Sequence, residues 1–146
     1  MRKSRIHAPW HLWSIAIVFI FLYSQGVYDY FMVLEPNLDY YESQGFGQEH
    51  LDYFTNYPPI PKVFWTAGVF SGLMAPVLLL FRSRWSIFLS LISAASQLIL
   101  AVVTFGLMRR WDVYGPWISL FDMAIVALTF GMYLYCRLMH SRGVLR

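Results

Sequence analysis

The stretch VFWTAGVFSGLMAPVLLLF (63–81), RSR (82–84) and WSIFLSLISAASQLILAVVTFGLM (85–108) decides the fold of this chain. Its two apolar runs contain no charged residue, and a basic turn of three residues is all that separates them. A helix needs about 20 mostly apolar residues to cross the hydrocarbon core of a bilayer, and each run is long enough. Because so short a turn must reverse the chain, we expect the two runs to form antiparallel, neighbouring membrane spans.

Two more apolar runs lie on either side of this stretch. They cover about residues 10–32 and 115–136, and each is interrupted by one acid, Asp29 in the first and Asp122 in the second. The composition agrees, since 58% of the residues are hydrophobic and 13% are charged, against roughly 45–50% and 25% in soluble domains. We therefore predict a single transmembrane domain over residues 1–146, folded as an all-α, up-and-down bundle of four transmembrane helices.

Basic residues beside the spans predict how the chain lies in the membrane. Short cytoplasmic loops carry an excess of lysine and arginine. If both termini are cytoplasmic, the inner flanks hold eight basic residues: Arg2, Lys3, Arg5, Arg82, Arg84, Arg137, Arg142 and Arg146. The outer segments then hold three: Lys62, Arg109 and Arg110. This excess predicts both termini in the cytoplasm, with the first span retained as a signal anchor.

The connection between the first two spans, residues 35–61, is the only long one. Loops of this length usually carry structure of their own or a function. Asn37 is a suitable N-cap for a short helix ending at Gly45, and Gly47 precedes a second helical stretch that ends near Asn56. We expect one or two short amphipathic helices on the outer side, lying on the membrane surface or capping the bundle.

Two aspartates lie within the predicted spans, one to two helical turns from the outer end. An ionised aspartate at the bilayer centre costs roughly 2.5–3.5 kcal/mol on insertion scales, and less near the interface. With neighbouring polar residues they form a candidate polar cluster: Gln25, Asp29, Gln97, Arg109, Arg110 and Asp122. Two interpretations remain open. The cluster binds a substrate, a proton or a partner group, or structural Asp–Arg or Asp–Tyr contacts tie spans one, three and four together.

Small residues predict where the helices touch, because lipid provides no hydrophobic drive for helix association. The second, third and fourth spans each carry small residues at helical spacing. These candidate packing faces are Gly68 and Gly72, then Ser86, Ser90 and Ser93, then Ala124, Ala127 and Gly131. We interpret them as close helix contacts rather than as a polar pathway.

Motifs for catalysis, metal binding or cofactor binding are missing from the sequence. It contains no GxSxG elbow, P-loop or HExxH motif, and no histidine lies in a span core where it could ligate a haem. Cys136 is the only cysteine, which excludes an internal disulfide and a cysteine-based metal cluster. The basic residues form no stripe of the kind that binds nucleic acid. We predict no enzyme activity, no cofactor, no metal and no nucleic-acid partner.

Several short motifs resemble a known group of proteins. APWHLW (8–13), GVYDY (26–30), DYF (52–54), the segment 58–65 and LLL (78–80) recur in this order in a group of uncharacterised small four-span bacterial inner-membrane proteins, some loosely labelled sugar transporters. The resemblance covers most of the chain. It implies a location in the bacterial inner (plasma) membrane, and it makes Asp29 part of the shared pattern.

Two functions follow as hypotheses. The absence of catalytic motifs and the small-residue faces favour an accessory or scaffold subunit that packs against a larger membrane protein complex. The alternative is a small transporter that self-associates and uses Asp29 or Asp122 near the outer face. Membrane lipids, other membrane subunits or further copies of the chain are the expected partners.

Overall fold

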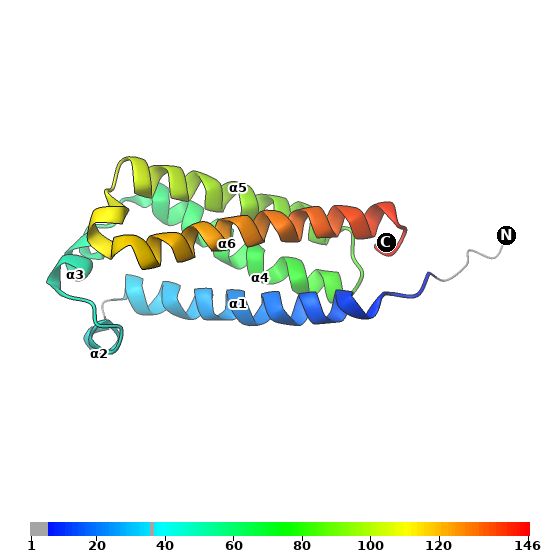
Figure 1. The fold of residues 1–146 in the computed structure, drawn as a ribbon, viewed down its shortest axis with the longest axis horizontal. Helices are drawn as coiled ribbons and strands as arrows, with labels where there is room; N and C mark the ends of the chain where they lie inside the picture. The colour runs from blue at the N-terminus through cyan, green and yellow to red at the C-terminus, as the bar shows by residue number, and fades with distance from the viewer. Residues whose placement is uncertain (1–5, 36) are drawn as a thin grey trace.

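The computed structural model describes residues 6–35 and 37–146, and these residues form six helices and no strand (Figure 1). The long helices are α1 (Trp10–Leu34), α4 (Pro59–Leu80), α5 (Trp85–Gly106) and α6 (Arg110–Ser141). The short helices are α2 (Leu38–Ser43) and α3 (Gln48–Thr55). The prediction of an all-α fold is confirmed, and the four long helices are each long and apolar enough to cross a membrane.

The four long helices lie side by side along the molecule, and the short helices α2 and α3 lie together at one end (Figure 1). We call this the loop end. The C-terminus and the start of α1 lie at the opposite end, which we call the terminal end. Helix α1 packs on α4, α4 on α5, and α5 on α6. The two antiparallel neighbours predicted from the sequence, α4 and α5, therefore share the most extensive contact in the bundle.

Two helices differ in extent from the predicted spans. Helix α4 begins at Pro59, whereas the sequence predicted a span from residue 63, because proline is well tolerated in the first turn of a helix. Helix α6 extends from Arg110 to Ser141 but bends at Gly115, whose φ of 75° and ψ of 178° are not helical. Since Pro116 follows, the chain makes about one turn of helix, kinks, and then starts the predicted fourth span.

Of the one or two short helices predicted in the long connection, two are present. The side chain of Asn37 accepts a hydrogen bond from the backbone of Tyr40 and so caps α2, and α3 starts directly after Gly47. Their aromatic residues join those of α4 and α6 in one cluster at the loop end. The sequence left open whether the short helices lie on the membrane surface or cap the bundle. Since they share this cluster with the long helices, they cap the bundle.

The turn between α4 and α5 is tied to both ends of the chain. Arg82, whose φ is 57°, donates from its side chain to the carbonyls of Ile6 and Val144 at 2.9 Å each. The backbones of Arg84 and Arg146 are also joined, with Arg84 N donating to Arg146 O at 2.8 Å. The predicted basic residues Arg2, Lys3 and Arg5 lie outside the described residues. Among the described ones, the C-terminal tail closes the terminal end of the bundle.

A seam of small and polar side chains runs along the middle of the bundle. Ser86, Ser90 and Ser93 are buried on the face of α5 predicted for packing. The hydroxyl of Ser93 donates to the carbonyl of Gly68 at 2.7 Å, which requires α4 and α5 to approach closely. Gly72 lies against a tyrosine ring from α1. Five of the predicted small residues, two on α4 and three on α5, thus lie at helix contacts.

The predicted small-residue face of α6 does not pack against the other helices of this chain. Ala124, Ala127 and Gly131 are exposed, and a side chain added at Gly131 would meet nothing within 4 Å. Helix α6 instead turns Ser119, Thr129, Met132, Cys136 and Met139 inward. The hydroxyl groups of serine and threonine can bond their own backbone, as Thr129 does with the carbonyl of Ile125 at 2.8 Å, so they fit a buried helix contact as well as alanine does.

Candidate ligand cavity at the loop end

A partly open cavity of about 320 Å³ lies at the loop end, lined by all four long helices and by the connection that carries α2 and α3. Helix α1 contributes residues between Leu22 and Val33, and α6 contributes residues between Arg110 and Val126. Trp65 and Val69 of α4 and several residues of α5 complete the wall. Residues far apart in the sequence therefore meet around one space.

Two hydrogen bonds join α1 to α6, one near the terminal end and one at the wall of the cavity. His11 Nδ1 lies 2.6 Å from the hydroxyl of Tyr135, and the Tyr23 hydroxyl is hydrogen-bonded to Thr129. Among the described residues, no hydrogen bond links α1 to α6 closer to the loop end than Tyr23. Gly26, which lies on the loop-end side of Tyr23, lines the cavity. A Cβ atom added at Gly26 would meet nothing within 4 Å.

Asp29 lines the cavity and accepts both of its hydrogen bonds on one oxygen. Its Oδ1 accepts from the hydroxyl of Tyr40 at 2.7 Å and from Nε2 of Gln25 at 3.2 Å. Within the described residues, no group donates to Oδ2 and no lysine or arginine forms an ion pair with Asp29. The Asp–Tyr contact considered from the sequence is therefore present, but it connects α1 to α2 rather than to another span.

Asp122 forms the Asp–Arg contact that the sequence suggested. Nε of Arg110 lies 2.6 Å from Oδ2 of Asp122, and the two side chains are only 18% and 28% exposed. The guanidinium of Arg110 also lies over the ring of Tyr114, 4.6 Å from its centroid. Because the kink at Gly115 sets the first turn of α6 back against the rest of the helix, this pair closes within one helix.

Arg109 does not belong to the cluster. It forms an exposed pair with Asp112 at 3.2 Å, with the side chains 83% and 64% exposed. Gln97 does line the cavity, and its side chain packs against Gly68, 3.3 Å from where a Cβ atom would lie. Five predicted members of the polar cluster thus surround one cavity: Gln25, Asp29, Gln97, Arg110 and Asp122.

Aromatic side chains form much of the remaining wall, and sequence reasoning did not assign them to the site. The ring of Phe54 from α3 lies 5.7 Å from that of Trp65, and Phe46 lies 5.5 Å from Tyr114. Burial, together with the hydrogen bond to Asp29, raises the pKa of Tyr40, so its phenol stays protonated and remains a donor. The aromatic faces of the two short helices were visible in the sequence and could have suggested this wall. The sequence did not show which other helices these faces contact.

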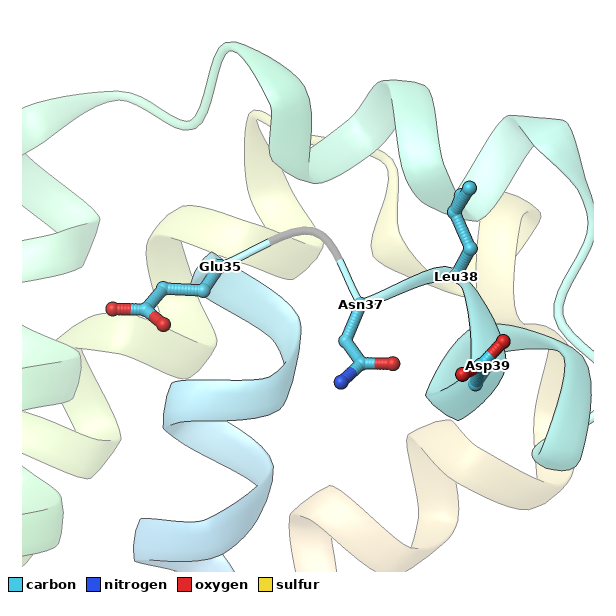
Figure 2. Close-up of a pocket in the computed structure, with 4 residues that line it drawn as sticks. All are labelled: Glu35, Asn37, Leu38 and Asp39. Atoms are coloured by element: carbon cyan, nitrogen blue, oxygen red, sulfur yellow. The ribbon is translucent and has the colours of Figure 1, made fainter.

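A second hollow, at the junction of α1 and α2, is open and has no converging groups (Figure 2). Glu35, Asn37, Leu38 and Asp39 line it. Figure 2 shows the Glu35 side chain at the end of α1 extending away from Asp39, which lies on α2. Because these two acids do not converge, we do not treat this hollow as a site.

In residues 6–35 and 37–146, no three His, Cys, Asp or Glu side chains gather to hold a metal ion. His50, next to two acids in the sequence, accepts a hydrogen bond from the backbone of Gly47 at 3.1 Å and stacks on Phe46. Comparisons with protein-family models, with curated proteins and with solved structures find no match to this chain. The resemblance to small four-span bacterial proteins stays a prediction, and the function must be inferred from the cavity.

Proposed function

We propose that this chain is a multi-pass protein of the bacterial inner membrane that binds a small amphipathic molecule in its loop-end cavity, on the outer side. The observation that carries the proposal is the cavity wall, which combines aromatic rings with the carboxylate of Asp29, whose Oδ2 receives no hydrogen bond from the described residues. Ligand sites are typically concave, mostly apolar and equipped with a few well-placed polar groups. The volume of about 320 Å³ lies at the lower end of the roughly 300–1,000 Å³ found for ligand pockets.

The charge distribution supports the orientation in which the loop end faces outward. Five arginines lie beside the terminal end of the described bundle: Arg82, Arg84, Arg137, Arg142 and Arg146. Every acid of the chain lies in the half nearer the loop end or in the connection itself. The positive-inside rule then favours the terminal end as the cytoplasmic side. A ligand would reach the cavity from outside or from the outer leaflet.

The shape of the cavity favours binding over transport by a single chain. Towards the terminal end the bundle is filled by a buried apolar cluster that includes Leu12, Leu79 and Met139. On α5, Ser90 and Ser93 lie between Ile87, which packs on this cluster, and Gln97, which lines the cavity, and both hydroxyls donate to backbone carbonyls. A transporter that uses Asp29 or Asp122 would have to open this packed half or assemble a pathway from several copies.

Filling the cavity tests the proposed function. We expect Ala101→Phe, which adds a ring to a residue of the cavity wall, to displace the bound molecule. Ala95→Phe is the matched control, because Ala95 is exposed on the same helix and does not line the cavity. Native mass spectrometry of protein released from lipid nanodiscs should show an adduct with the unmodified chain and with Ala95→Phe, and at least about tenfold less with Ala101→Phe. No adduct in any form, or equal adducts in all three, would refute ligand binding.

The accessory-subunit hypothesis is a second candidate, supported by the outward-facing Ala124, Ala127 and Gly131. Small residues let the backbones of two membrane helices approach closely. If a partner helix packs there, Gly131→Leu should abolish a complex seen by native electrophoresis from mild detergent. Gly106→Leu is the control, since both glycines have open space around them. Equal complexes with both variants would count against this face as an interface.

A further inference from the structure

The charged groups that face the cavity leave one negative charge without a partner. Three charged residues of the described chain line it: Asp29, Arg110 and Asp122. Arg110 and Asp122 neutralise each other at 2.6 Å, and the ring of Tyr114 further occupies the guanidinium. Asp29 therefore determines the net charge of the cavity, and an anionic ligand would find no free cation among these residues.

The surroundings of Asp29 fit a cation better than they fit water alone. The carboxylate receives hydrogen bonds only on Oδ1, from neutral donors, and its Oδ2 has no donor in the described residues. An ionised carboxylate in a largely apolar space is costly unless it is paired. A positively charged group that reaches Oδ2 would neutralise this partly buried carboxylate.

The aromatic wall favours the same kind of group. Tyr57, Trp65 and Phe121 line the cavity along with Tyr40, whose hydroxyl already binds Asp29. The negative faces of aromatic rings attract cations within about 6 Å of the ring centroid, and cages of such rings recognise quaternary ammonium groups. A space with several rings and one carboxylate that no described cation neutralises matches an alkylammonium ion in both charge and hydrophobicity.

We infer that the cavity takes a ligand that carries an ammonium group, with Asp29 as its counter-ion. This inference rests on the proposed function and adds the chemical class of the ligand. The ammonium group has two possible sources. One is a small soluble amine, and the other is the headgroup of phosphatidylethanolamine, which would enter between α1 and α6 on the loop-end side of Tyr23, where the described residues form no hydrogen bond between these helices.

The first arm of the test compares choline with 3,3-dimethyl-1-butanol, which has the same shape with carbon in place of the charged nitrogen. Isothermal titration calorimetry on the purified full chain should show choline binding at least about tenfold more tightly. Asp29→Asn should remove that preference, because asparagine keeps an acceptor for Tyr40 and loses only the charge. The comparison of the two ligands on the unmodified chain needs no variant and holds even if Asp29→Asn folds poorly.

The second arm identifies a lipid source. The chain is reconstituted in nanodiscs of equal parts phosphatidylethanolamine and phosphatidylglycerol, and the lipids that remain bound are identified by native mass spectrometry. Retention of phosphatidylethanolamine that is lost in Asp29→Asn indicates a headgroup, and choline selectivity without such retention indicates a soluble amine. If neither ammonium compound is preferred, the inference is wrong. If Ala101→Phe still removes an adduct in that case, ligand binding stands and only the ammonium assignment fails.

Discussion

Replacing Gly72 with alanine is expected to destabilise the bundle by about 1–3 kcal/mol, the usual cost of overpacking a core. A Cβ atom at this position would lie 2.1 Å from Cε1 of Tyr23. The ring cannot move aside freely, because its hydroxyl bonds Ser93 on α5 and Thr129 on α6. Thermal unfolding followed by a thiol-reactive dye measures the effect, since Cys136 is buried and is the only cysteine of the chain.

Two further variants separate this clash from a general effect of alanine. Gly131→Ala should be neutral or slightly stabilising, because a side chain there meets nothing within 4 Å and alanine favours a helix over glycine. In a Tyr23→Ala background, Gly72→Ala should lose most of its cost, since the ring it strikes is gone. If Gly72→Ala destabilises the protein equally in both backgrounds, the clash with the Tyr23 ring is not the reason for its cost, and the prediction is wrong.

Asp122→Asn is expected to lower stability by about 2 kcal/mol. Removing one partner of a buried ion pair costs roughly 3–5 kcal/mol, exposed pairs contribute roughly 0–1 kcal/mol, and the pair with Arg110 is partly buried. The variant leaves the Arg110 guanidinium without its carboxylate at the cavity wall. The melting temperature from dye labelling of Cys136 reports the loss.

The chain offers a matched control for this prediction. Asp112→Asn breaks the other arginine–aspartate pair of the same helix, with Arg109, and should change stability by less than about 0.5 kcal/mol because both side chains are exposed. If Asp122→Asn is as mild as Asp112→Asn and yet abolishes ligand binding, Asp122 acts in the site rather than in the fold. The two interpretations of the acids left open by the sequence are thereby separated.

Much of the loop-end architecture was predictable because its signals are local. The N-cap at Asn37 and the helix break at Gly45 depend on neighbouring residues, so one or two short helices were predicted at these positions. The helical spacing of Ser86, Ser90 and Ser93 predicted the packing face of α5 for the same reason. Asp29 stood out because an acid is rare in an apolar run.

The choice of partners was not predictable. From the sequence, Arg109 and Arg110 were equally able to reach an acid within the spans. The kink at Gly115 places Arg110, rather than Arg109, against Asp122. Tyr40, the donor to Asp29, was placed only in an amphipathic helix with no known neighbour. The direction of α2 relative to α1 depends on contacts made by the whole aromatic cluster, which no local pattern encodes.

By itself, the sequence determined that four helices are long and apolar enough to cross a membrane, where they begin and end to within about five residues, and that a structured connection joins the first two. Only the tertiary structure decided how each helix is rotated about its axis. Lipid and a neighbouring helix are similarly apolar surroundings, so hydrophobicity does not tell an inward face from an outward one. For that reason the sequence did not reveal that Ala124, Ala127 and Gly131 face outward while Thr129 faces inward. The same rotations bring Gln25, Asp29, Gln97, Arg110 and Asp122 around one cavity.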